Sequence, residues 1–311
     1  MTSNHVDRTE AGKRMRRISI VSALPVACVV AAAVTLAAQN PAPPAASPAG
    51  GAALPLQNLG LEHLDIIVPD TAATARFYSR IFKTVLHEQK VQTSLRYFVV
   101  LGDVPADRQV GYVAIGAAQG RAPAIGHYCV LAKVYDRAGM GTALQAAGFP
   151  GIRGTGGLGM WPDPDGIELQ LFQPPAGLVT AAVKSALPAG DGMVEPRGVD
   201  HMLLRVSSLE KALPYYRLLY GTAAERPRDA EGRVWFHLDR DTRLALKQGG
   251  AGQAPTIEHY ALKVGPFDRA AVTARLKELG VRTLPSSDEP DVLRFEDDNG
   301  IIVELRPPAG K

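Results

Sequence analysis

The chain has 311 residues, 46% of them hydrophobic, and carries a formal net charge of +3 at pH 7. Such a length holds one large domain or two of ordinary size, and the apolar fraction suits a globular core. Residues 1–38 contribute five basic and two acidic side chains and so account for the whole charge excess. The neutral remainder excludes the basic surface by which a protein holds nucleic acid.

A basic cluster at residues 13–17 precedes an uncharged, apolar run at 18–38. This order is typical of a secretory signal peptide, and Leu36-Ala37-Ala38 offers a small-residue cleavage site. The run has 21 residues, so the alternative is an uncleaved membrane anchor. Both interpretations predict an exported protein, periplasmic or extracellular, and the second adds membrane attachment through residues 1–38. Residues 39–58 are rich in Pro and Ala and predict a flexible linker without a core of its own.

The two cysteines, Cys28 and Cys129, are too few for a disulfide framework or a thiolate metal cluster. Cys28 falls within the N-terminal apolar run. Cys129 lies on a predicted strand, and we expect it to be a small core residue rather than a nucleophile.

The rest of the chain repeats itself at a constant offset. His63 corresponds to His201, and the aromatic pair Phe77-Tyr78 corresponds to Tyr215-Tyr216, each 138 residues later. A repeat of this length indicates a duplicated domain. The predicted organisation is a first domain over 59–175, a linker over 176–196 and a second domain over 197–308.

Within the first copy, strands and helices follow one another as in an α+β fold. Asp70 can cap one helix and Asp136 another, which stops at Gly148. His87 would lie near the end of the first helix or in the next turn, as a structural residue. The predicted elements are a strand over 61–68, a helix over 71–82, strands near 95–101 and 109–116, a strand from 126, a helix after 136 and a strand over 167–172.

The second copy carries helix signals of its own. Ser207 and Glu210 fit a capping box at the start of its first helix. A helix near 268–279 is expected to end at Gly280 in the left-handed conformation. Tyr78 and Tyr216 lie within the predicted helices of the two copies and are expected to be packing aromatics.

Three strand-like runs of the second copy each place a ligand-type residue opposite an apolar stripe, because alternate side chains of a strand point to opposite faces. These residues are His201, His259 and Glu304. Two imidazoles and one carboxylate form a facial triad that leaves positions open on a divalent metal ion. A weaker copy of the set, His63, His127 and Gln170, precedes it.

Residues 60–308 resemble two tandem domains of the vicinal oxygen chelate superfamily, which includes glyoxalases, extradiol dioxygenases, fosfomycin-resistance proteins and bleomycin-binding proteins. The resemblance is specific for the fold and says little about the reaction. The residues that carry it are 63–70, Phe77-Tyr78, 126–128 and 163–166 in the first copy, and His201, Tyr215-Tyr216, 258–260, 295–300 and 303–305 in the second.

The resemblance implies an α+β fold in which each domain pairs two βαβββ units into a curved mixed sheet that forms a cup. It also implies that His201, His259 and Glu304 hold Fe2+, Mn2+, Zn2+ or Ni2+. In the first cup His63 and His127 match the ligand places, and Gln170 stands where the second copy has Glu304. Glu168 shares the strand face of Gln170 and is the alternative ligand.

One departure bears on the chemistry. Extradiol dioxygenases carry a Tyr ahead of the turn before the ligand Glu, and that place is near Arg294 here. His237 is a candidate acid–base group beside the metal, although a surface histidine is the simpler interpretation. Met160 and Trp161 would line the first cup as an apolar wall or close its end.

The sequence therefore predicts a metal-dependent enzyme of dioxygenase or glyoxalase/lyase type, acting on a small oxygen-rich substrate in the second cup. One alternative is a binding protein that sequesters a small molecule without catalysis, as the bleomycin-binding relatives do. Another is a duplicated scaffold with no ligand. The expected partner is a small-molecule substrate and not nucleic acid. Because two tandem domains can pair within one chain, both a monomer and a homodimer fit.

Overall fold

The structure is a computed structural model that describes residues 54–91, 93–102, 111–154, 159–174, 182–285, 289 and 291–308. The predicted signal or anchor over 1–38, Cys28 and most of the predicted linker over 39–58 lie outside this range. Among the described residues, no helix is long and apolar enough to span a membrane.

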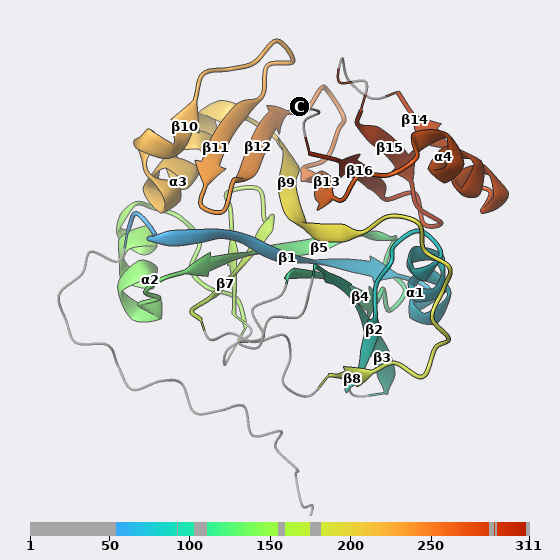
Figure 1. The fold of residues 1–311 in the computed structure, drawn as a ribbon. Helices are drawn as coiled ribbons and strands as arrows, with labels where there is room; N and C mark the ends of the chain where they lie inside the picture. The colour runs from blue at the N-terminus through green and yellow to red at the C-terminus, as the bar shows by residue number, and fades with distance from the viewer. Residues whose placement is uncertain are drawn as a thin grey trace, which may run out of the picture. The chain divides into compact units, whose positions relative to one another are not determined.

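The first half of the body forms one eight-stranded mixed sheet, with strands in the order β6-β7-β5-β1-β4-β3-β2-β8 (Figure 1). Its elements are β1 (Asn58–Val68), α1 (Thr71–Ser79), β2 (Leu86–Val91), β3 (Ser94–Leu101), β4 (Gly111–Ala117), β5 (Ala124–Ala132), α2 (Arg137–Ala146), β6 (Met160–Pro162), β7 (Glu168–Phe172) and β8 (Val183–Lys184).

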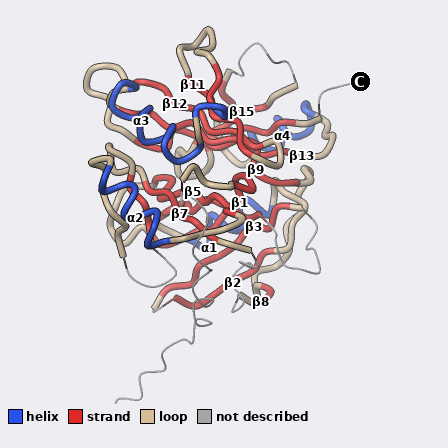
Figure 2. The backbone as a smooth tube through the Cα atoms, turned by 90° about the vertical axis from the view of Figure 1, so that its left-hand side faces the viewer, coloured by secondary structure: helices blue, strands red, loops and turns tan. Residues whose placement is uncertain are grey.

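The second half forms another eight-stranded sheet, in the order β10-β11-β12-β9-β13-β16-β15-β14. Its elements are β9 (Pro196–Val206), α3 (Leu209–Tyr220), a 3-10 turn (Thr222–Ala224), β10 (Glu225–Arg226), β11 (Val234–Leu238), β12 (Thr242–Gln248), β13 (Thr256–Val264), α4 (Arg269–Glu278), β14 (Thr283–Leu284), β15 (Leu293–Glu296) and β16 (Ile302–Arg306). In Figure 2 the strands of each half gather in their own sheet. The predicted α+β fold with two mixed-sheet domains is confirmed.

One expected helix signal was wrong. The first helix of the second half is capped by Ser208, whose hydroxyl accepts a hydrogen bond from the Lys211 amide at 3.4 Å. Ser207 instead donates to Asp165 of the first half at 2.6 Å, so it is not available for a capping box with Glu210. Gly280 has φ +74° after α4, which confirms the expected left-handed cap.

The strand β2, next to the two-residue edge strand β8, was not anticipated. His87 lies in this strand, paired with Phe98 of β3 and Lys184 of β8, and not at the end of a helix. The residues of β2 are mostly polar and only partly buried, so hydrophobic and polar residues do not alternate along it and the period-2 signal is weak.

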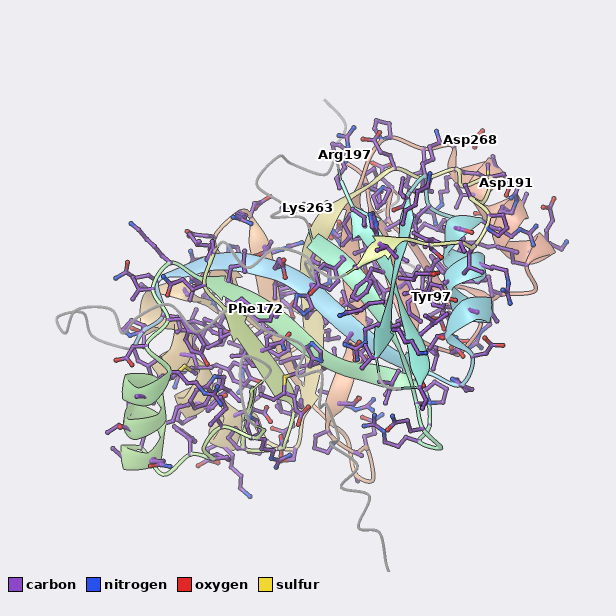
Figure 3. The ribbon with its side chains drawn as sticks, turned by 90° about the horizontal axis from the view of Figure 1, so that it is seen from below. Tyr97, Phe172, Asp191, Arg197, Lys263 and Asp268 are labelled. Atoms are coloured by element: carbon purple, nitrogen blue, oxygen red, sulfur yellow. The ribbon has the colours of Figure 1, made fainter. Side chains whose placement is uncertain are left out.

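Parts of both predicted linkers are packed against the domains. Leu56 is buried in the core, and its amide donates to Leu219 of α3 at 2.7 Å, so the end of the 39–58 segment is not a free tether. Val194 is also buried, and its amide donates to Ile81. Asp191, labelled in Figure 3, pairs with Arg275 of α4 at 2.7 Å. Backbone hydrogen bonds and apolar burial thus hold these connections in place.

One hydrophobic core joins the two halves. The apolar stripes of the first strands of each half are fully buried in it: Leu64, Ile66 and Val68 in β1, and Met202, Leu204 and Val206 in β9. Trp161 is also fully buried and donates its indole N–H to Tyr135, so it belongs to the core and not to a cup wall. Because each sheet buries this face, the alternate face of each strand carries the ligand-type residues.

Reciprocal tyrosine–aspartate hydrogen bonds tie the halves together inside this core. Tyr78 of α1 donates to Asp297 at 2.8 Å, and its hydroxyl lies 2.9 Å from that of Tyr260. Tyr216 of α3 donates to Asp163 at 2.9 Å in the same way. Helix α1 therefore reaches the turn before β16, and α3 reaches the turn before β7. The two tyrosines are packing residues, as expected, and they also satisfy buried carboxylates.

We predict that Tyr78→Phe and Tyr216→Phe each lower the free energy of unfolding by about 1–3 kcal/mol, because each leaves a buried carboxylate oxygen without its donor. Chemical denaturation of the purified protein measures this. Tyr97→Phe is the control, because Tyr97 is buried in the same core but belongs to neither contact. Variants at Tyr78 and Tyr216 that unfold no more easily than Tyr97→Phe would show that these bonds do not hold the halves together.

Candidate metal centre

A β-bulge shapes the second cup. Val199 pairs with Leu262 and His201 with Ala261, so Asp200 has no partner across β13. An extra residue of this kind bends a strand and redirects a side chain. Its effect here is that Asp200, which would point away from His201 in a regular strand, accepts a hydrogen bond from the Nδ1 of His201 at 2.7 Å.

The predicted triad of the second cup converges. The Nε2 atoms of His201 and His259 lie 3.2 Å apart. The Glu304 carboxylate lies 3.9 Å from the first of these nitrogens and 4.0 Å from the second. Nitrogen and oxygen ligands bind a divalent ion at about 2.0–2.2 Å, so two ligands of one ion lie at most about 4.4 Å apart. All three distances satisfy that limit, and the residues present fit a metal ion.

The imidazoles are in the form that binds metal. Asp200 accepts from Nδ1 of His201, which leaves the lone pair of Nε2 directed at the cup. Burial would raise the pKa of Asp200, but the hydrogen bond from His201 and the nearby Arg243 hold it well below its usual range. Burial lowers the pKa of His259 well below its ordinary value and keeps it neutral, which is the form that binds metal.

Arginines surround the triad. Arg306 donates to Glu304 at 2.5 Å and lies 3.7 Å from Asp200. Arg294 lies 3.5 Å from the other carboxylate oxygen of Glu304, on the neighbouring strand β15. Arg243 donates to Asp200 at 2.5 Å. Arg294 thus occupies the place, noted from the sequence, where extradiol dioxygenases carry a Tyr.

The first cup repeats the arrangement with weaker donors. The Nε2 of His63 lies 2.9 Å from the amide oxygen of Gln170 and 3.4 Å from the Nε2 of His127. Burial lowers the pKa of His127 well below its usual value, and the neighbouring His63 adds to this effect. Both distances meet the same limit, but a neutral amide replaces the carboxylate. The structure therefore brings together all three residues predicted for this cup.

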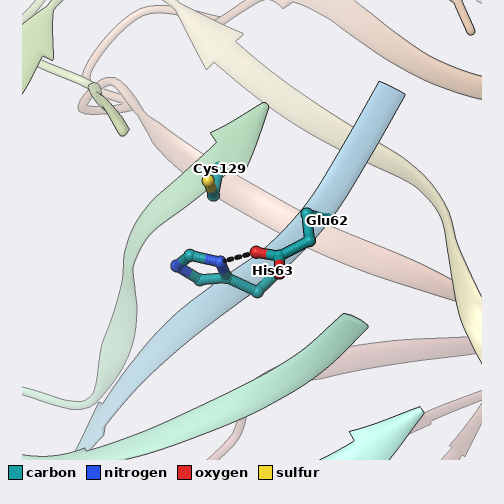
Figure 4. A group of neighbouring side chains, drawn as sticks. All are labelled: Glu62, His63 and Cys129. Carbon is teal, nitrogen blue, oxygen red and sulfur yellow. Dashed lines mark hydrogen bonds and ion pairs between the residues drawn. The ribbon is translucent and has the colours of Figure 1, made fainter. Parts of the chain in front are cut away.

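Glu62, His63 and Cys129 form a second possible ligand group in the first cup (Figure 4). The Glu62 carboxylate contacts Nδ1 of His63, on the opposite side of the ring from Nε2. We assign it the orienting role of Asp200, because Nε2 is the atom that faces His127 and Gln170. Burial raises the pKa of the Cys129 thiol well above its usual value, so it stays protonated and is a poor ligand.

Two other predicted residues lie at the margins of the sites. Glu168 pairs in register with His127 on β5, and its carboxylate lies 3.9 Å from Arg153, while Gln170 supplies the contact to His63. His237 is exposed on β11, two strands from His201 across β12. Strands about 4.8 Å apart put it roughly 10 Å from His201. Burial and nearby arginines lower its pKa.

Glu62 and Asp200, the carboxylates that contact Nδ1 of His63 and His201, were not recognised from the sequence. An acidic residue directly precedes each first-strand histidine, as Glu62 before His63 and Asp200 before His201. In a regular strand such neighbours point to opposite faces, so only the bulge shows that they touch. The repeated acidic–His pair was the available signal.

We predict that Asp200→Asn weakens metal binding by about 10- to 100-fold, the usual effect of removing the carboxylate that orients a ligand histidine. Titration against a competing chelator measures the dissociation constant. Asp241→Asn is the matched control, because this side chain is 97% exposed at the start of β12. Equal affinities for the two variants would remove the orienting role of Asp200.

No protein-family model matches the sequence, and no curated protein is similar to it in sequence. Solved structures do resemble it. BphC, a halotolerant catechol dioxygenase, has a TM-score of 0.59 at 17% identity, over 81% of this chain and 87% of that chain. The Mn(II)-bound glyoxalase from Novosphingobium aromaticivorans has a TM-score of 0.55 at 16% identity, over 82% and 84%. Homoprotocatechuate 2,3-dioxygenase from Brevibacterium fuscum, solved with 3,4-dihydroxyphenylacetate, has a TM-score of 0.58 at 16% identity, over 82% of each chain.

These likenesses extend over both sheets and show the fold at identities too low to show the reaction. The body of this chain has the tandem vicinal oxygen chelate fold that these dioxygenases and this glyoxalase share.

Proposed function

We propose that the chain is a metal-dependent enzyme whose reaction takes place in the second cup. The observation that carries the proposal is the convergence of His201, His259 and Glu304 within the span of one ion, with Asp200 behind the first histidine. The ligands are divided between three strands of one rigid sheet, β9, β13 and β16, as a preorganised site requires. The bound ion, one of Fe2+, Mn2+, Zn2+ or Ni2+, supplies Lewis acidity toward two neighbouring oxygens of a substrate.

The protein residues control what happens around those oxygens. The ligand side chains are only 3–5% exposed, so few water molecules compete for the open positions. The rings of Trp235 and His201 make a T-shaped contact with 5.2 Å between their centroids, and Trp235 supports one side of the cup. Arg294 and Arg306 place fixed positive charge next to Glu304, where negative charge developing on a substrate is stabilised.

Between the two reaction classes, glyoxalase/lyase chemistry has the better support. A guanidinium does not lose its proton in a protein, so Arg294 stabilises charge but cannot exchange a proton with the substrate. The tyrosine expected at this place in an extradiol dioxygenase could do so. Dioxygenase chemistry remains the alternative, and an acid–base role for His237 at the rim of the cup belongs to that alternative.

Small-molecule binding without catalysis is a second candidate function, and the first cup supports it. There the neutral Gln170 replaces the carboxylate, and the ring of Tyr112 stacks on His63 at 4.3 Å between centroids. Aromatic walls and a weak ligand set suit retention of a ligand better than activation of one.

We also propose that the protein acts outside the cytoplasm. The support is in the sequence alone, in the basic cluster at 13–17 and the apolar run at 18–38. The proposed partner is a small-molecule substrate, and the fold is compatible with a monomer or a homodimer, with membrane attachment if residues 1–38 are retained.

We predict that the purified protein contains near-stoichiometric transition metal and that His201→Ala and Glu304→Ala each remove it from the second cup. Elemental mass spectrometry measures the metal content. His237→Ala is the control, since this exposed histidine lies two strands from His201 and should leave the metal in place. His63→Ala, measured alongside, separates any metal held by the first cup.

The identity of the bound metal would also distinguish between the two reaction classes. Iron favours oxygen chemistry, whereas zinc or nickel favours the lyase or isomerase class. Protein that stays metal-free after incubation with each of the four ions would overturn the enzyme proposal and favour the binding function.

A further inference from the structure

The duplication allows the two cups to be compared position by position. In the second sheet, Arg243, His201, Ala261, Glu304 and Arg294 lie in one row across five paired strands. In the first sheet the matching strands place Tyr112 beside His63, and Cys129, Gln170 and Met160 in the corresponding row. Arg243 therefore takes the place of Tyr112, and Arg294 the place of Met160.

The same strand register identifies two further pairs of equivalent positions in the two cups. Arg306 lies two residues after Glu304, as Phe172 lies two residues after Gln170. Trp235 pairs with Ala245 as Phe98 pairs with Ala114. Of these four wall positions, three change from neutral in the first cup to arginine in the second.

The first cup is lined by aromatic rings. Tyr112 stacks on His63 with an interplanar angle of 12°, and Phe98 meets Tyr112 edge-on at 5.4 Å. Phe172 lies 6.0 Å from His63, at the end of β7 (Figure 3). These rings carry no charge, and Arg96, the arginine whose charge reaches His127, pairs with Asp65 at 3.5 Å.

The second cup has the opposite character. Its guanidiniums, Arg243, Arg294 and Arg306, face three carboxylates, Asp200, Glu304 and the more exposed Glu289. These charges cancel. A divalent ion held by the triad leaves two positive charges uncompensated, before Lys247, whose charge reaches His259, is counted.

The hydrogen-bonding capacity of these three arginines is not fully used by the protein. The Nε of Arg294 is buried and makes no hydrogen bond to the described residues, and its ion-pair contact to Oε2 of Glu304 is 3.5 Å long. A buried donor of this kind costs free energy unless something fills its place. The guanidinium also lies beside a metal ligand, where an acceptor on a bound substrate would meet it.

We infer that the second cup selects an anionic substrate, a small oxygen-rich molecule whose carboxylate is bound by Arg294 with Arg243 and Arg306 around it, while its neighbouring oxygens face the triad. Arginine suits this role because its planar fork pairs with both oxygens of a carboxylate. The inference rests on the proposed function, since the uncompensated charge arises when metal is bound. It adds the substrate's charge, which the fold does not specify.

The test uses two matched pairs of probes on the full chain loaded with Zn2+, which has no redox chemistry. One pair is 3,4-dihydroxybenzoate and 3,4-dihydroxybenzamide, and the other is 3,4-dihydroxyphenylacetate and its amide. Each pair shares the same two neighbouring oxygens and differs only in charge, so the metal's contribution cancels. Calorimetry should show at least tenfold tighter binding of the carboxylate in one or both pairs.

Arg294→Met, which installs the residue of the equivalent first-cup position, should reduce that preference to under threefold with metal content unchanged. Arg294→Lys should keep part of it. Arg217→Met removes an exposed arginine of α3 that pairs with Glu225, and should leave the preference intact. Circular dichroism of each variant checks that it is folded.

Equal binding of carboxylate and amide in both pairs, or no binding of either carboxylate, would overturn the inference. A preference that survives Arg294→Met would overturn the assignment to this arginine. Metal content measured on the same samples separates this failure from that of the proposed function. Protein that binds no metal contradicts the enzyme, whereas metal-loaded protein without the preference contradicts only the anionic substrate.

Discussion

The hydrophobic core shared by the two halves is the constraint on which the rest of the structure depends. The stripes of β1 and β9 are fully buried in it, and strand alternation then places His63 and His201 on the faces that do not contribute to this core. The same core receives Tyr78 and Tyr216, which hydrogen-bond to the turns before β16 and β7. The packing that stabilises the fold therefore also fixes the strands that carry the candidate ligands.

Small irregularities in the strands, the β-bulges, place the side chains that orient the candidate ligands. The bulge in β9 frees Asp200 to hold His201 by its Nδ1. The first sheet has an extra residue at the corresponding place in β1, between the pairs formed by Leu61 and Leu64. Both copies thus keep the device that orients the first histidine. They differ in the third ligand, a carboxylate in one and an amide in the other, and in the walls. The duplicated scaffold is shared, and the divergence lies in a few cup-facing side chains.

Much of this was predictable from the sequence because the repeat and the strand alternation are local signals. The offset between His63 and His201 predicted the duplication, and the stripes around His201, His259 and Glu304 predicted a common face. The bulges were not predictable, since they depend on pairing with distant strands. Nor was the cap at Ser208, because Ser207 is bound by Asp165 of the other half. The arginines around Glu304 gave no periodic signal that distinguishes a cup wall from an ordinary solvated strand face.

The most direct test of the account is anomalous X-ray diffraction from crystals of the protein grown with each candidate ion and measured at that ion's absorption edge. The account predicts a peak bounded by the Nε2 atoms of His201 and His259 and the carboxylate of Glu304, within about 2.0–2.2 Å of each. A metal peak elsewhere in the chain, or an empty second cup with every ion, would contradict the central claim.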